Sequence, residues 1–298
     1  MMVLLTKTSV ALISVTILFS ILFTGCAVLS DDARFPISGD GVSDADTLTV
    51  LVSILPQEEF VKQVGGEHVT VRSLIPPGAS PATYDPRPSD LKMVERADIY
   101  FTIGHIPFEK THLDTLRSYN KAMIIVDTSK DVSLIGKNDS IDPHIWLSPK
   151  QVTRQVRTIE QALIEKDPEH ETSYSENADS YIESLDELDN RLDDMFEHSD
   201  TERILVFHPS WGYLARDYGF EQIAIEDEGK EPTARHMRSI VDMASEHRIR
   251  TILIQDQFDS SVAKSIAEEI NATVIPVDPL AREYVQNLKN VSGVISVS

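Results

Sequence analysis

The segment from Asp142 to Pro149, with the sequence DPHIWLSP, contains residue types that can hold a metal ion. One ring nitrogen of His144 can coordinate a cation. Asp142 is close enough in the sequence to accept a hydrogen bond from the other nitrogen, which would fix the tautomer of the ring. Trp146 would supply an apolar wall beside it. Because a single loop histidine is a weak signal, the hypothesis of a metal site depends on further ligands elsewhere in the chain.

Two other candidate ligands follow apolar, strand-like runs. His208 comes directly after residues 204–207, and Asp278 comes directly after residues 274–277. In parallel α/β sheets, ligands bind beyond the carboxyl ends of the strands. We therefore expect these two residues to meet His144 in a cleft between two lobes. Two imidazoles and a carboxylate suit zinc, and less exclusively manganese or iron.

Strand-like and helix-like segments alternate in both halves of the chain. Strands are expected at residues 49–55, 69–75, 99–103, 123–126, 204–207, 223–225, 251–254 and 273–277. Helices are expected between them at residues 57–64, 89–97, 108–118, 209–218, 233–247 and 260–270. This alternation with short links predicts an α/β fold, in which each parallel sheet has helices on both faces.

Two helices are expected between these α/β units. Ser148, with a proline directly after it and a glutamine three residues after it, predicts a helix over residues 149–166 with the serine hydroxyl as N-cap. A longer helix is expected over residues 172–198. Its apolar stripe consists of Tyr181, Leu185, Leu188, Leu192 and Met195. That spacing predicts a long helix packed along one side on both flanking units.

The chain begins with an apolar run over residues 1–24 that carries a single charge, Lys7, and is followed by glycine and Cys26. Such a run predicts an export signal and not a lasting transmembrane span. A lone cysteine after small residues is similar to the lipobox at which lipoproteins are cleaved and lipidated; a signal-anchor helix is the alternative. Residues 27–46 are rich in Asp, Ser and Gly, and we expect them to form a flexible tether.

The net charge limits the possible partners. The chain has 48 acidic and 27 basic residues, which gives a formal net charge of −21. This balance argues against nucleic acid or anionic lipid as a ligand, because both carry the same sign of charge. The single cysteine excludes a disulfide within the chain.

Four motifs resemble those of the zinc/manganese solute-binding proteins of ABC transporters, in the periplasmic zinc-binding type known as cluster A-I. They are the DPHIWLSP segment, FHPSWGY at residues 207–213 with the later Tyr218-Gly219 pair, DPLA at residues 278–281, and PPGASPATYDP at residues 76–86. The motifs occur in matching order, and the likeness covers nearly the whole chain after residue 46.

This resemblance implies two lobes, each with a four-stranded, mainly parallel sheet, joined by one long backbone helix. The corresponding divisions are a lipoprotein signal peptide at 1–26, a tether at 27–46, an N-terminal lobe at 47–170, the linking helix at 171–200 and a C-terminal lobe at 201–298. It also implies metal ligands at His144, His208 and Asp278. A histidine at the third ligand position, His208, favours zinc, because manganese and iron binders usually have glutamate there.

The function that the resemblance implies is that of an extracytoplasmic receptor, held at the outer face of the cell membrane by a lipid on Cys26. It would bind a divalent cation, zinc first, and deliver it to an ABC permease in the membrane. We expect the protein to be a monomer that binds no nucleic acid and is not an enzyme.

The chain departs from this family at Ala82, where the resemblance implies a histidine ligand. Alanine cannot coordinate a metal, so either water completes the site or another side chain takes the position. His105 is the best substitute, because it follows the strand expected at residues 99–103 in the same lobe. Glu109 is a less favoured oxygen donor.

Two alternatives remain open. Three protein ligands and a water would also describe a catalytic zinc site, as in a zinc-dependent hydrolase. Against this alternative, the site motifs lack an obvious general base, because nothing sets Glu226, Asp227 or Glu228 on a bound water. The other alternative is a receptor for another solute, such as a metal chelate, or a degenerate site.

Overall fold

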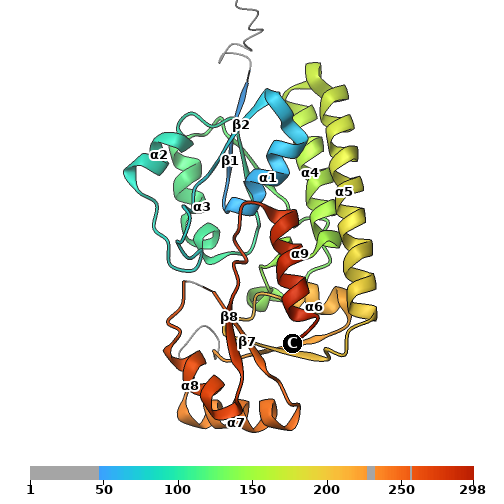
Figure 1. The fold of residues 1–298 in the computed structure, drawn as a ribbon. Coiled ribbons are helices and arrows are strands. Elements are labelled where there is room, and N and C mark those ends of the chain that lie inside the picture. The colour runs from blue at the N-terminus through green and yellow to red at the C-terminus, as the bar shows by residue number, and fades with distance from the viewer. Residues whose placement is uncertain (1–46, 227–231, 256) are drawn as a thin grey trace, which may run out of the picture. The chain divides into compact units, whose positions relative to one another are not determined.

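The computed structural model describes residues 47–226, 232–255 and 257–298 (Figure 1). The expected signal peptide with Cys26 and the expected tether at 27–46 lie outside these ranges. Within them, no helix combines the length and the apolar character that crossing a membrane requires.

The first sheet contains four parallel strands in the order β2-β1-β3-β4. The strands are β1 (Leu48–Val52), β2 (Val69–Ser73), β3 (Ile99–Thr102) and β4 (Ile124–Asp127). They are connected by α1 (Leu55–Gly65), α2 (Pro88–Val94) and α3 (Pro107–Tyr119). Every residue of β3 is buried, as expected of a central parallel strand that is covered on both faces.

The second sheet repeats this arrangement with the strand order β6-β5-β7-β8, again with all neighbours parallel. Its strands are β5 (Arg203–Val206), β6 (Glu221–Ala224), β7 (Thr251–Ile254) and β8 (Thr273–Pro276). The connecting helices are α6 (Gly212–Tyr218), α7 (Ala234–Glu246) and α8 (Ser261–Ile270). The predicted fold class, α/β with two four-stranded parallel sheets, is confirmed.

Two long helices, α4 (Pro149–Lys166) and α5 (Glu171–Glu197), separate the sheets in the sequence and pack against each other (Figure 1). Helix α5 also contacts α1 from the first unit and α6 from the second, as its apolar stripe predicted. The buried side chains of that stripe are Tyr174, Ala178, Tyr181, Leu185, Leu188, Leu192 and Phe196. Met195, which was also expected in the stripe, is half-buried, whereas Phe196 is fully part of it, because it lies four residues after Leu192 and so on the same face.

The last helix, α9 (Tyr284–Ile295), was not among the expected elements. It packs beside α5 (Figure 1). Its first residue, Tyr284, also places its ring edge-on to Phe60 of α1, with ring centroids 5.0 Å apart. The backbone N–H of Tyr284 donates a hydrogen bond to Glu59 Oε2 at 2.7 Å. The start of α9 therefore stabilises α1, and the rest of α9 packs on α5.

Helix α4 begins at Pro149 as predicted, but the predicted cap is wrong. The Ser148 hydroxyl makes no capping hydrogen bond and donates instead to the carboxylate of Asp217. Gln151 Nε2 donates to the same carboxylate at 2.9 Å. Because Asp217 belongs to α6, the two residues expected to form a local cap tie α4 to the second unit.

Glu109 is a carboxyl group near the start of α3 that is only 2 % exposed. Its oxygens accept hydrogen bonds from the backbone N–H groups of Ile103 at 2.8 Å and Gly104 at 2.7 Å, and from the Ser53 hydroxyl. These bonds hold the loop that follows β3, and they engage both oxygens of Glu109. Burial raises the pKa of Glu109 to about 7, against the opposing effect of the same hydrogen bonds.

This pKa predicts a pH-dependent contribution to stability. Because the ordinary value is 4.5, the folded state holds a proton between about pH 4.5 and 7 that the unfolded state has lost. The contribution is therefore complete below about pH 4.5 and is lost as the pH rises through 7, by about 3 kcal/mol in all. In Glu109→Gln the side chain cannot ionise, so the variant should not show this loss. The free energy of unfolding of the variant minus that of the wild type should therefore rise by about 3 kcal/mol between pH 4.5 and pH 8. Urea unfolding at both pH values measures this difference, and a difference that does not change with pH would contradict the prediction.

Candidate metal-binding site

The ring of His144 is oriented by Asp142. His144 follows the loop after β4 and directly precedes a short 3₁₀ turn, Ile145–Leu147, before α4. Asp142 Oδ1 lies 2.7 Å from His144 Nδ1 and also accepts a hydrogen bond from the backbone N–H of His144 at 2.9 Å. A carboxylate can only accept at Nδ1, so the proton lies on that nitrogen and Nε2 carries a lone pair. The Trp146 ring lies 5.2 Å from the imidazole between centroids.

His208 is oriented in the same way by Glu226. His208 lies just beyond the carboxyl end of β5, and Glu226 lies just beyond β6, its neighbour in the sheet. Glu226 Oε1 lies 2.7 Å from His208 Nδ1, and the Glu226 side chain is only 6 % exposed. The Phe258 ring stacks on the His208 imidazole, with ring centroids 5.3 Å apart. The role of Glu226 was missed in the sequence, although its place at a strand end next to β5 was a usable signal.

The two imidazoles face each other, although 64 residues separate them in the chain. Their Nε2 atoms are 3.3 Å apart. With both protons on Nδ1, neither Nε2 can donate to the other, so the pair presents two lone pairs to one point. Two nitrogen ligands about 2.0 Å from one zinc ion at a tetrahedral angle lie about 3.3 Å apart. The spacing is therefore that of two ligands of a single metal ion.

The second unit holds the loop of His144 in place. The Tyr213 hydroxyl donates to the backbone oxygen of Asp142 at 2.8 Å and accepts from the backbone N–H of Ile135 at 3.1 Å. Trp146 Nε1 donates to the backbone oxygen of Pro279 at 2.7 Å. Tyr213 is the second residue of α6, which begins four residues after His208, so the segment that follows one imidazole holds the loop of the other.

The other two predicted ligands lie elsewhere. Asp278 follows β8 and Val277, and its Oδ1 accepts a hydrogen bond from the backbone N–H of Leu280 at 2.8 Å. It borders a small neighbouring hollow. His105 Nε2 lies 3.4 Å from the Ser129 hydroxyl; burial lowers the pKa of His105, while Asp127 acts to raise it. Across the part of the chain that the structure describes, no three His, Cys, Asp or Glu side chains are placed to share a metal ion.

The facing imidazoles open into a cleft of about 680 Å³. The loop that carries Ala82 forms part of its wall, and so do Gln222, Gln255 and Gln257. Asp142 and Glu226 are its acidic residues, and both are bound to imidazoles. The cleft therefore combines two nitrogen donors with amide groups. At Ala82, where the resemblance implied another histidine, its wall has no side-chain donor.

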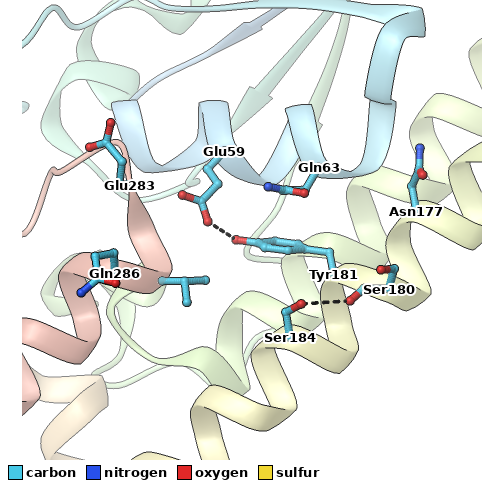
Figure 2. A pocket seen from close by; sticks show the side chains of 9 residues that line it. Glu59, Gln63, Asn177, Ser180, Tyr181, Ser184, Glu283 and Gln286 are labelled. Atoms are coloured by element: carbon cyan, nitrogen blue, oxygen red, sulfur yellow. Dashed lines mark hydrogen bonds between the residues drawn. The ribbon is translucent and has the colours of Figure 1, made fainter.

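A second hollow, of about 400 Å³, lies between α1, α5 and the start of α9 (Figure 2). Most of the residues that line it are polar, but none of them is a histidine. Figure 2 shows Glu59 directed toward Tyr181, whose hydroxyl donates to it at 2.9 Å. Burial raises the pKa of Glu59, which disfavours the ionised form that a metal ion would need. This hollow does not offer the nitrogen donors found in the cleft.

A close approach of Gly212 to Asp142 allows a test of the orienting carboxylate. A Cβ atom on Gly212 would lie 2.6 Å from Asp142 Oδ2. Gly212→Ala should displace this carboxylate, release the ring of His144 and weaken zinc binding about 10-fold, as is usual for the loss of a group that orients a metal ligand. Gly293→Ala is the matched control, because a Cβ there would meet no atom within 4 Å. Competition with a chromophoric zinc chelator measures both affinities. Equal affinity for the two variants would contradict the role given to Asp142.

The chain is similar to proteins of zinc uptake. The family described as "Zinc-uptake complex component A periplasmic" matches residues 50–296. The "High-affinity zinc uptake system protein ZnuA" of Bacillus subtilis is 27% identical over 257 residues, which cover 78% of this chain and 79% of that protein. The "Zinc-binding lipoprotein AdcA" of Streptococcus pneumoniae is 25% identical over 285 residues, which cover 89% of this chain and 56% of the longer relative.

The fold of this chain is also similar to that of a solved ZnuA structure. A zinc-bound deletion mutant of ZnuA superimposes with a TM-score of 0.81 at 36% identity, covering 85% of this chain and 99% of that one. The family match extends over both sheets and both site histidines. This chain belongs to the periplasmic zinc-uptake component A family of metal-binding proteins.

Proposed function

We propose that this protein is the extracytoplasmic receptor of an ABC uptake system, which binds a divalent cation in the cleft and delivers it to the permease. The observation that carries the proposal is the distance of 3.3 Å between His144 Nε2 and His208 Nε2. Each of these rings is held by a carboxylate on its other nitrogen. Paired imidazoles suit zinc, with manganese or iron as alternatives. The names of the relatives, which refer to zinc uptake and zinc binding, support the same cargo.

The proposed protein ligands are His144, His208 and Asp278, with His105 as the protein candidate for a fourth position. Asp142 and Trp146 form the surroundings of the first ligand. Asp278 borders a small hollow that shares Gln257 and Leu280 with the wall of the cleft. A change in its side chain or loop would therefore be needed to bring its carboxylate to the imidazoles.

Binding without catalysis is the proposed activity. Of the three acidic residues considered as a general base, Glu226 is the one that the structure describes, and it accepts the Nδ1 proton of His208. A carboxylate engaged in this way orients a ligand and is not directed at a metal-bound water. This arrangement supports a receptor over a zinc-dependent hydrolase.

The proposal extends to the ends and divisions of the chain. We propose that residues 1–26 are a lipoprotein signal peptide, that a lipid on Cys26 anchors the protein to the outer face of the cell membrane, and that residues 27–46 are the tether. The proposed N-terminal lobe, linking helix and C-terminal lobe are residues 47–170, 171–200 and 201–298. The "lipoprotein" in the name of the AdcA relative supports the anchor. A monomer is proposed.

The ligands can be tested one at a time by zinc titration of the purified protein. His144→Ala and His208→Ala should each weaken zinc binding at least about 100-fold, or about 3 kcal/mol, because each removes one of two facing donors. Asp278→Asn should weaken it about 10-fold. His198→Ala is the control, since the side chain of His198 is 73% exposed and is hydrogen-bonded to its own helix. Zinc affinity that survives both histidine substitutions would contradict the proposed function.

A further inference from the structure

The cleft is larger than a bare metal ion requires. Its volume is about 680 Å³. A bound water takes up about 30 Å³, so an ion with two waters would fill roughly a tenth of this space. Cavities of roughly 300–1,000 Å³ are typical of sites for small organic molecules. The size of the cleft indicates a ligand with more atoms than a hydrated ion.

The donors that line the described part of the cleft leave coordination positions open. His144 and His208 supply two donors, and Asp278 would supply a third after the change in its side chain or loop noted above. A tetrahedral zinc ion then keeps one position for another donor, and a five-coordinate ion keeps two. Ala82 lines the cleft and offers no donor. His105 does not belong to the lining of the cleft, and its Nε2 lies beside Ser129.

The charge of the wall restricts what could fill these positions. Among the described residues that line the cleft there is no lysine or arginine, whereas Asp142 and Glu226 are acidic. A chelator with several negative charges would therefore find no cationic partner among these described residues, only the metal ion. A complex with a positive or zero net charge fits this wall better.

The wall also offers groups for an organic molecule. Ile106, Ile141, Phe258 and Leu280 form apolar surface. Gln257 also lines the cleft, and its Oε1 is buried with no hydrogen-bond partner in the described part of the chain. Such an amide has hydrogen-bonding capacity left for an N–H donor of a bound molecule.

We propose that the cleft takes zinc together with a small chelating molecule of the amino acid type. Its amine nitrogen and one carboxylate oxygen would fill the open positions on the side of Ala82. An amino carboxylate carries one negative charge when it chelates, so its 1:1 complex with Zn²⁺ keeps one positive charge. This inference rests on the metal-receptor function proposed above and names the form in which the metal is bound.

Equilibrium dialysis of the metal-free protein tests the proposal. The protein is dialysed against isotope-labelled L-histidine, glycine or citrate, each with and without one equivalent of zinc. We expect about one L-histidine or glycine per protein, retained only when zinc is present. Citrate, which carries three carboxylates, should not be retained and should only remove zinc from the protein. A protein that retains zinc but no labelled amino acid when both are supplied would overturn the proposal.

Three variants locate the open positions. Ala82→His adds an imidazole to the exposed loop of the cleft and should keep zinc while losing the labelled amino acid. His105→Ala distinguishes this arrangement from the alternative above in which His105 is the fourth ligand: it should retain both zinc and the amino acid, because His105 does not line the cleft. Asp227→Asn, Glu228→Gln and Asp256→Asn, combined in one protein, should also retain both; these residues lie outside the described ranges. Loss of zinc from either of the last two proteins would show that protein side chains fill the positions, and the proposal would be wrong. Circular dichroism confirms that each variant is folded.

The dialysis experiment distinguishes failure of the metal-receptor function from failure of the chelate inference. If no zinc is retained by the wild type with or without an amino acid, the metal-receptor function is wrong. If zinc is retained alone and added L-histidine only lowers its apparent affinity by competition, the receptor function stands and the chelate inference is overturned.

Discussion

The site depends on one repeated interaction, a carboxylate that accepts the Nδ1 proton of an imidazole. Asp142 binds His144 and Glu226 binds His208, each with a distance of 2.7 Å. This bond fixes the tautomer, so both Nε2 atoms have a lone pair, and it fixes the direction of each ring. It also adds electron density to the donor nitrogen, which strengthens its bond to a cation. Two neutral rings would gain little by directing their Nε2 atoms at each other in water, and this arrangement is the main support for the proposed cation between them.

The arrangement is maintained by packing at the junction of the two sheet units. Helix α6 follows His208 and supplies Tyr213, which binds the backbone of Asp142, and Asp217, which binds Ser148 and Gln151. The absence of a side chain at Gly212 lets this helix approach Asp142 closely. Because α6, β5 and the start of α4 are linked in this way, these contacts between helices and loops set the distance between the imidazoles.

Much of this arrangement could be predicted from the sequence. The alternation of strands and helices, and the start of α4 at Pro149, were correct because they depend on short-range patterns of apolar residues and on proline. Asp142 could be assigned to His144 because only one residue separates them. Helix α9 was missed, although Tyr284, Leu288, Val291 and Ile295 have helical spacing. The cap at Ser148 was wrong because a carboxylate from α6 competes for the hydroxyl, and local sequence does not reveal such an acceptor.

The sequence by itself determined the elements and the residue types of the site, since each of these depends on neighbours along the chain. Only the tertiary structure decided which donors meet. It brought His144 and His208 to 3.3 Å, paired Glu226 with His208, and placed His105 beside Ser129. The physical reason is that strand order and helix packing fix distances between residues far apart in the chain. A difference of a few ångströms, which no sequence pattern records, separates a metal ligand from an ordinary loop residue.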